Sequence, residues 1–204
     1  MSTVLLLVRH ATNDFVGRAI AGRAPGVHLN EEGKRQAHGL AERLGTIPIA
    51  AIYTSPLERT RETAEPLAAR LNITPRALDK LHEIDCGDWT GKTFPELDRE
   101  REWQLWVAQR TQARPPGGES IIEVQRRAVD AIAQLRAEHE GETVVLVSHG
   151  DVIKAALAHF LRISLDDLET FDIAPASVSA IQAGVDWAQV KLVNETGALP
   201  ATCR

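Results

Sequence analysis

Short apolar runs alternate with amphipathic stretches along most of this chain. Residues 4–8 and 144–147 are unbroken runs of Val and Leu that end at polar residues, a pattern typical of strands buried on both faces of a parallel sheet. Residues 49–53 predict a third strand of this kind, and residues 76–78 predict a short fourth one. We expect the first three to be neighbours at the centre of a single sheet.

Helix starts between and after these strands are marked by capping residues. Asn30 precedes a helix over about residues 31–44, whose first turn is acidic, as the helix dipole favours. Ser55, with a proline next to it and a glutamate three residues on, predicts the N-cap of a second helix. Ser120 opens a third helix with a capping box, and a fourth helix follows His149.

The rest of the chain contains an irregular segment and a hairpin. Residues 81–118 are rich in Trp and Pro, and we interpret them as an insertion of loops and short helices that shapes a pocket. Residues 177–182 and 188–193 predict an antiparallel hairpin at one edge of the sheet. The alternation of strand and helix predicts an α/β fold: a three-layer α/β/α sandwich with a mainly parallel central sheet, in a single domain over residues 1–204.

Composition and charge narrow the class of protein. The two cysteines, Cys86 and Cys203, lie far apart and outside any metal-binding pattern, so we expect reduced thiols and a cytoplasmic protein. No apolar run approaches the roughly 20 residues of a membrane span, so we expect no membrane association. The net charge of −5 argues against a nucleic-acid surface, so we expect any cluster of arginines to bind a small anion. The sequence leaves open whether the chain is a monomer or a homodimer.

Two histidines directly follow two of the predicted central strands. Arg9 and His10 come after the first strand, and His149 comes just after residues 144–147. Since the carboxyl ends of parallel strands form the edge at which open α/β sheets carry their chemistry, we expect these side chains to converge there with Arg59. A single histidine of this kind is more often a loop residue. The pair beside an arginine favours a catalytic site.

These residue types suit phosphoryl transfer. A neutral imidazole can take a phosphoryl group covalently, and His10 is the candidate nucleophile. The guanidinium groups of Arg9 and Arg59 match the oxygens of the transferred group, and His149 can bind a further oxygen. Glu83 is the candidate acid for the leaving oxygen. We expect no metal and no cofactor, since the arginines supply the positive charge.

Several other residues near this edge are candidates for weaker roles. Backbone N–H groups beyond Gly150 add the polarity of a helix start to the phosphate pocket. Arg23, in the loop after His10, is a candidate for binding a substrate anion, whereas Arg61 points to a different helix face from Arg59 and is expected to be solvated or salt-bridged. The tryptophans of the insertion either line the mouth of the pocket or pack the insertion against the sheet.

Five segments carry a resemblance to a known family. They are residues 6–10, 54–64, 81–91, 117–120 and 147–150. In this order they resemble the successive motifs of the histidine phosphatase superfamily, in its phosphoglycerate-mutase-like branch, and they cover most of residues 4–160. The resemblance implies His10 as the phosphorylated nucleophile and Glu83 as the proton donor. It also implies the two arginines and His149 as the rest of the phosphate pocket.

The chain departs from the family just after the nucleophile. The family commonly has a glycine, an acid and a small hydroxyl residue there, and this chain has Ala11, Thr12 and Asn13. Val16 stands where the family places an asparagine that helps to hold substrate phosphate, so Asn13 becomes a candidate for substrate binding. The block that ends at Gly91 and the compact length resemble the family's phosphatases more than its cofactor-dependent mutases.

The sequence therefore predicts a phosphomonoesterase that hydrolyses a small phosphorylated metabolite through a phosphohistidine. The alternative is a phosphoglycerate mutase or related phosphomutase, in which a hydroxyl group replaces water as the acceptor. A metallophosphatase built on His10, Glu83, His149 and Asp151 is disfavoured because two arginines would repel the metal. A non-catalytic phosphate-binding module is disfavoured because binding requires neither a nucleophile nor a proton donor.

Overall fold

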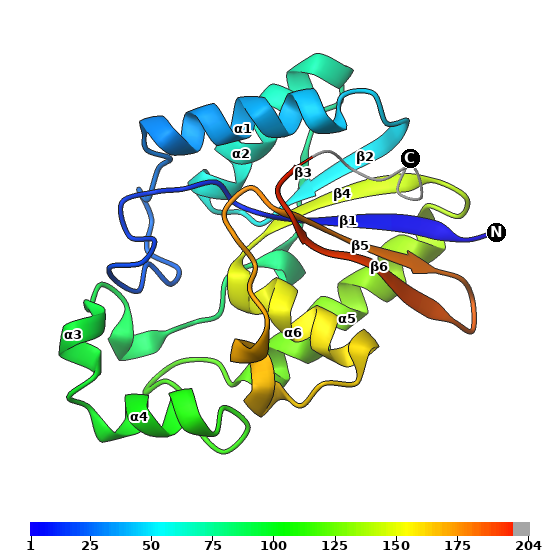
Figure 1. Ribbon diagram of the computed structural model, residues 1–204. Coiled ribbons are helices and arrows are strands. Elements are labelled where there is room, and N and C mark those ends of the chain that lie inside the picture. The colour runs from blue at the N-terminus through cyan, green and yellow to red at the C-terminus, as the bar shows by residue number, and fades with distance from the viewer. Residues whose placement is uncertain (198–204) are drawn as a thin grey trace.

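A six-stranded sheet forms the centre of the computed structural model, which describes residues 1–197 (Figure 1). The strands are β1 (Thr3–Arg9), β2 (Ile49–Thr54), β3 (Arg76–Ala77), β4 (Thr143–Ser148), β5 (Val178–Ala183) and β6 (Ala188–Glu195). Their order is β3-β2-β4-β1-β5-β6. The first four in this order run parallel, while β5 lies antiparallel to both β1 and β6. The mainly parallel sheet, its central trio of strands and the antiparallel hairpin at its edge are thus confirmed.

Helices cover both faces of this sheet, with α1 and α2 on one side and α5 and α6 on the other (Figure 1). Their bounds are α1 (Glu31–Leu44), α2 (Glu58–Leu71), α5 (Ile121–Glu138) and α6 (Gly150–Leu161). Successive residues of β1 point to opposite faces: Leu6 and Val8 pack with the first helix pair, and Leu5 and Leu7 pack with the second. Two apolar cores therefore enclose the sheet, which confirms the three-layer sandwich.

The second helix, α2, begins later than its sequence predicts. Its N-cap is Leu57, which is extended (ψ 145°) and forms no side-chain cap, so the predicted N-cap at Ser55 is wrong. The Ser55 hydroxyl accepts a long hydrogen bond from the Leu57 N–H (3.4 Å) and lies 2.9 Å from Nε2 of His149. Ser55 therefore contacts His149 at the carboxyl ends of the parallel strands and does not cap the helix. The caps predicted at Asn30 and Ser120 are confirmed.

Residues 81–118 form short helices and turns beside the carboxyl ends of the parallel strands (Figure 1). The elements in and around this segment are the 3-10 helices η1 (Asp79–Leu81) and η2 (Gly87–Trp89) and the helices α3 (Phe94–Leu97) and α4 (Arg101–Ala108), and a further 3-10 helix, η3 (Leu165–Thr170), follows α6. Trp89 is buried and meets the rings of Trp103 and Trp106 edge-on, at 5.2 and 6.0 Å between centroids. These rings both pack the insertion and line the cavity described below. Among residues 1–197, no helix is long and apolar enough to cross a membrane.

Candidate active site

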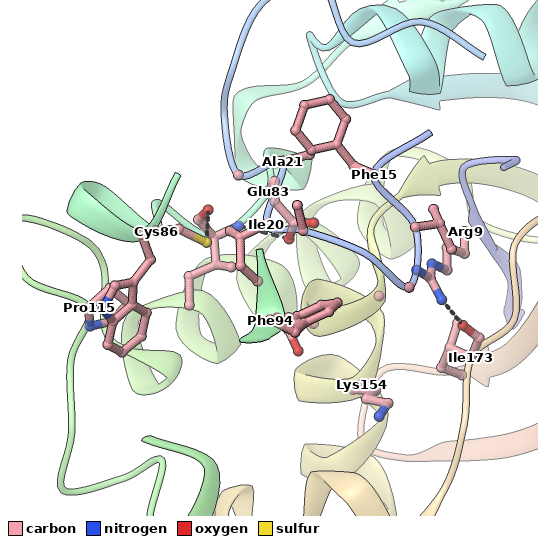
Figure 2. Close-up of a pocket in the computed structure, with 18 of the residues that line it drawn as sticks. Arg9, Phe15, Ile20, Ala21, Glu83, Cys86, Phe94, Pro115, Lys154 and Ile173 are labelled. Carbon is pink, nitrogen blue, oxygen red and sulfur yellow. Dashed lines mark hydrogen bonds between the residues drawn. The ribbon is translucent and has the colours of Figure 1, made fainter. Parts of the chain in front are cut away.

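The register of β1 and β4 brings the two histidines together. Arg9 and Ser148 are paired across these parallel strands, so the next residues, His10 and His149, lie at the same edge of the sheet. Their ring centroids are 5.2 Å apart. A cavity of about 470 Å³ opens at this edge, and its lining includes Arg9, His10 and Arg59. Figure 2 shows this cavity, with Arg9 labelled among the residues that line it.

His10 is buried, and its tautomer follows from one hydrogen bond. Its Nδ1 lies 2.8 Å from the carbonyl oxygen of Ala11. A carbonyl oxygen accepts and cannot donate, so Nδ1 carries the proton and Nε2 keeps a free electron pair. Burial, followed by the charges of Arg59 and Arg9, lowers the pKa of His10 to about 3. The imidazole is therefore neutral at physiological pH and available as a nucleophile.

Two guanidinium groups beside His10 carry buried N–H groups without an acceptor among residues 1–197. Arg59 is 1% exposed and donates from Nη2 to the carbonyl of Gly22 (2.8 Å), while its Nε and Nη1 find no partner within residues 1–197. Arg9 donates from Nη1 to the carbonyl of Ile173 (2.6 Å, the dashed line between these two residues in Figure 2), and its Nε is likewise unpartnered in that part of the chain. Leaving such donors buried is costly, so the arrangement favours an anion bound between them.

His149 is fully buried and contacts three side chains of the site. Nε2 is 2.9 Å from the Ser55 hydroxyl, and Nδ1 is 3.3 Å from Nη2 of Arg59 and 3.5 Å from a carboxylate oxygen of Glu83. Burial, with the charge of Arg59 next, lowers the pKa of His149 well below its usual range, so the ring is neutral. Because Arg59 can only donate, Nδ1 accepts and Nε2–H faces Ser55. His149 thus holds Arg59, and its direct contact with phosphate stays a prediction.

Glu83 lines the cavity together with His10. One of its carboxylate oxygens accepts the N–H of Ile84 (2.9 Å). Burial raises the pKa of Glu83 to about 7, and the negative charge of Asp151 is the second cause. A carboxyl group with this pKa can give a proton to a leaving oxygen and later take one from water at neutral pH.

The three weaker candidates lie in different surroundings. Asn13 is buried at the cavity, where its Oδ1 accepts a backbone N–H (3.0 Å) and its Nδ2 has no partner among the described residues. Gly150 begins α6 and also lines the cavity. Arg23 is not among the lining residues; its Nε donates to the carbonyl of Glu83 (2.7 Å) and its Nη2 to Glu119 (2.9 Å). The contact of Arg23 with a substrate anion stays a prediction.

Part of the cavity wall consists of residues that the sequence did not single out. Arg110 is 8% exposed and bridges Asp151 (3.0 Å) and Glu169, and Lys154 also contacts Glu169 (3.1 Å). Aromatic rings from the loop after His10 and from the insertion complete the wall. The Trp-rich composition indicated these rings, but Lys154 on α6, Arg110 in a loop and Glu169 in η3 belong to no motif that would mark them.

The chain and its fold are similar to those of known phosphatases. It is 34% identical over 181 residues to phosphoserine phosphatase 1 of Hydrogenobacter thermophilus. The aligned region covers 87% of this chain and 85% of that protein. The solved structure of a mycobacterial glucosyl-3-phosphoglycerate phosphatase matches with a TM-score of 0.84 and 28% identity, over 95% of this chain and 99% of that one.

A longer relative and a family model complete the comparison. The chain is 39% identical over 204 residues to a bifunctional protein of Mycobacterium tuberculosis. The aligned region covers 97% of this chain but only 55% of that protein's length. The model of the histidine phosphatase superfamily (branch 1) matches residues 5–196. The chain therefore belongs to branch 1 of the histidine phosphatase superfamily.

Proposed function

We propose that this chain is a phosphomonoesterase that hydrolyses a small phosphorylated metabolite through a phosphohistidine at His10. The observation that carries the proposal is the pair of guanidinium groups, Arg9 and Arg59, whose buried N–H donors have no acceptor among residues 1–197 and lie beside a neutral imidazole. A phosphate group between Arg9 and Arg59 supplies the missing acceptors and presents its phosphorus to Nε2 of His10. The phosphatases among its relatives support the same reaction class.

The reaction consists of two transfers. In the first, Nε2 of His10 forms a bond to phosphorus as the ester P–O bond breaks, and the proton of Glu83 goes to the departing oxygen. In the second, water attacks the phosphohistidine while the Glu83 carboxylate takes its proton, which releases inorganic phosphate and restores both residues. Arg9 and Arg59 remain on the equatorial oxygens, where negative charge accumulates. His149, 3.3 Å from Arg59, orients that guanidinium.

The acceptor of the phosphoryl group separates this proposal from a phosphomutase. A mutase passes the group from His10 to a hydroxyl group, whereas two of the three relatives reported above are named as phosphatases, so we propose water as the acceptor. Assays with 3-phosphoglycerate, with and without bisphosphoglycerate, distinguish the two reactions. Release of inorganic phosphate supports the phosphatase, and isomerisation of the phosphoglycerate would contradict it.

The proposal includes no metal and no cofactor. Within residues 1–197, no three or more His, Cys, Asp or Glu side chains form a group that could hold a metal ion. Arg9 and Arg59 would moreover repel a divalent cation placed beside His10. We expect full activity after dialysis against EDTA. A loss of activity that a divalent metal restores would favour the metallophosphatase.

Trapping of the phosphoenzyme tests the nucleophile. Wild-type protein quenched during turnover of a radiolabelled phosphomonoester should contain an acid-labile, alkali-stable phosphoryl group. His10→Ala should contain none and should lose turnover, while the matched variant His38→Ala, at an exposed position of α1, should keep both. A phosphoenzyme in His10→Ala would overturn the assignment. A wild-type protein that binds phosphate but hydrolyses no phosphomonoester would favour the non-catalytic module.

We further propose one domain over residues 1–204, with the insertion at about 81–118, in a cytoplasmic protein that is a monomer or a homodimer. The single sheet to which both the first and the last strand belong supports one domain. The free thiol of Cys86 is compatible with a reducing compartment, and Cys203 lies outside the described residues. Light scattering distinguishes monomer from homodimer, and cell fractionation tests the compartment.

A further inference from the structure

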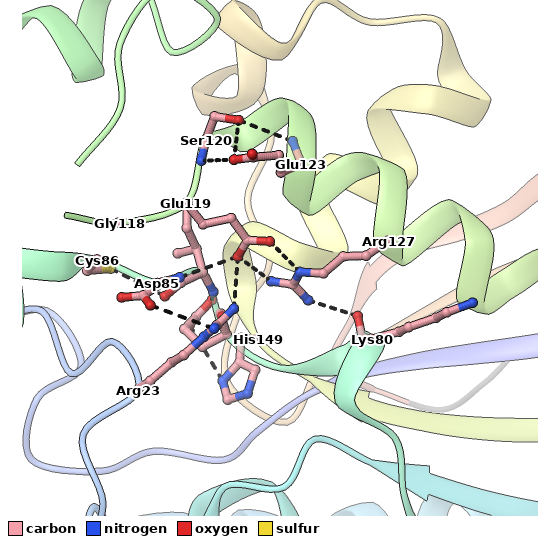
Figure 3. A network of polar contacts seen from close by, with 12 residues as sticks. Arg23, Lys80, Asp85, Cys86, Gly118, Glu119, Ser120, Glu123, Arg127 and His149 are labelled. Carbon is pink, nitrogen blue, oxygen red and sulfur yellow. Dashed lines mark hydrogen bonds and ion pairs between the residues drawn. The ribbon is translucent and has the colours of Figure 1, made fainter. Parts of the chain in front are cut away.

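The loop that carries Glu83 is held by two arginines from distant parts of the chain (Figure 3). Arg127 of α5 donates from Nη1 to the carbonyl of Lys80 (2.8 Å), which lies in η1 just before this loop. Arg23, from the loop after the nucleophile, donates from Nε to the carbonyl of Glu83 itself (2.7 Å). The backbone of the candidate proton donor is thus fixed from two sides.

Glu119 joins these two arginines to each other. In Figure 3 its carboxylate lies between them: it accepts from Nε and Nη2 of Arg127 (2.7 and 3.0 Å) and from Nη2 of Arg23 (2.9 Å). Its backbone N–H donates to the carbonyl of Asp85 (2.8 Å), which fixes the loop beyond Glu83. The side chains of Glu119 and Arg127 are only 15% and 17% exposed. Charge-assisted hydrogen bonds at this depth are stronger than those at the surface.

The same cluster is connected to the phosphate pocket through two adjacent residues. The carbonyl of Gly22 accepts from Nη2 of Arg59 (2.8 Å), and the next residue, Arg23, holds Glu83. One short segment therefore sets the position of a phosphate-binding cation and of the proton donor. A change at Arg23 acts on the proton donor without removing any group that touches phosphate.

We propose that Arg23, Glu119 and Arg127 are positioning residues that hold the Glu83 carboxyl group where it protonates the leaving oxygen. The proposal rests on the proposed function, because it takes Glu83 as the general acid. None of the three is among the residues that line the cavity, so they act through Glu83. Glu83 itself lies between two short 3-10 helices. A proton donor in such a loop requires outside support to stay within hydrogen-bond reach of the substrate.

Replacement of Arg23 by methionine tests this role, since methionine keeps an apolar stem but has no donor. We compare kcat/KM, which reports the steps up to phosphoenzyme formation, for glycerol phosphate, a poor leaving group, and p-nitrophenyl phosphate, a good one. Arg23→Met should lower kcat/KM for glycerol phosphate about tenfold or more and leave that for p-nitrophenyl phosphate near the wild-type value. The matched control is Arg18→Met, at an exposed position of the same loop, which should change neither.

A double variant distinguishes failure of this proposal from failure of the proposed function. If Arg23 acts through Glu83, Arg23→Met should have no further effect in a Glu83→Gln background. A loss that depends on the leaving group in Glu83→Gln, but not in Arg23→Met, would overturn the positioning role alone. A uniform loss in Glu83→Gln would overturn Glu83 as the acid and this proposal with it.

Two further outcomes complete the test. A higher KM for both substrates in Arg23→Met, with kcat unchanged, would show that Arg23 contacts substrate and would overturn the positioning role. Where Arg23→Met does not fold, Arg23→Lys gives the same comparison, because a single ammonium group keeps the charge but does not reproduce the fork between Glu83 and Glu119. Glu119→Gln, which weakens the contact between the two arginines, should show the same dependence on the leaving group.

Discussion

Arg59 and Arg61 lie two positions apart on α2 and have opposite surroundings. Arg59 is 1% exposed beside His10, whereas Arg61 is exposed. Arg59→Ala should therefore lower kcat/KM for a phosphomonoester about 100-fold or more, because a preorganised donor to the transferred group is lost. Arg61→Ala should change it little. Equal losses in the two variants on one substrate would show that the wrong helix face had been assigned to the phosphate.

The pKa of Glu83, about 7, and the pKa of His10, about 3, set the pH dependence of the first transfer. His10 stays neutral well into the acid range. Glu83 acts as an acid only while it is protonated, so kcat/KM for glycerol phosphate should fall as the pH rises above about 7. The fall should be weak for p-nitrophenyl phosphate and absent in Glu83→Gln. A fall of the same steepness in Glu83→Gln would assign this ionisation to another group.

Individual site residues were predictable where they directly follow a buried strand. His10 and His149 each come after an apolar run, so their place in the chain predicts their place in the fold. Arg23 lies in a loop without periodicity, and its partners are far along the chain. Asn13 was singled out only through the family pattern, and no local pattern shows that its amide nitrogen lacks a partner among residues 1–197. Contacts of this kind depend on the whole fold.

At the scale of elements, two polar residues that were both predicted to be N-caps form hydrogen bonds with different partners. Asn30 caps α1 through the N–H of Gly33 (2.9 Å), whereas Ser55 contacts Nε2 of His149 (2.9 Å). Asn30→Ala should lower the free energy of unfolding by about 1 kcal/mol without a change in kcat/KM. Ser55→Ala should lower kcat/KM, because His149 loses the partner that orients it against Arg59.

Chemical denaturation and steady-state kinetics on both variants check this contrast. Ser55→Ala with a loss of stability and unchanged kinetics would mean that Ser55 supports the start of α2 after all. Asn30→Ala offers the matched case, since none of the described residues that line the cavity belongs to α1. A lower kcat/KM in Asn30→Ala would show that α1 affects the active site as well as the stability of the fold.

Elements were predictable where a local pattern is enough to define them. The caps of α1 and α5 and the apolar runs of β1 and β4 required no knowledge of the rest of the chain. The start of α2 was not predictable, because the hydroxyl of Ser55 is turned toward His149. The helices α3 and α4 are too short to be stable alone. Their positions depend on packing among Trp89, Trp103 and Trp106, which the sequence does not reveal.

At the scale of the whole molecule, the sheet assembles the site from segments that are distant in the chain. β2, β4 and β1 are adjacent and parallel, so residues that follow all three meet at one edge. This architecture was predictable from the alternation of strands and helices. The shape of the cavity was not, since it depends on which side chains of α6 and of the insertion meet around it.

A phosphate ion bound at this edge should stabilise the whole fold, since its ligands come from β1 and α2 and its supports from α6 and the loops. A ligand that binds only the folded state at about 100 times its Kd contributes about 2.7 kcal/mol. For a chain of this size that corresponds to a rise in Tm of about 5–10 °C.

Thermal unfolding with saturating inorganic phosphate should show this rise, and sodium chloride at equal ionic strength should not. Arg59→Ala should lose the response while Arg61→Ala keeps it. An equal rise in wild type and Arg59→Ala would place the bound anion elsewhere and remove the main support for the proposed site.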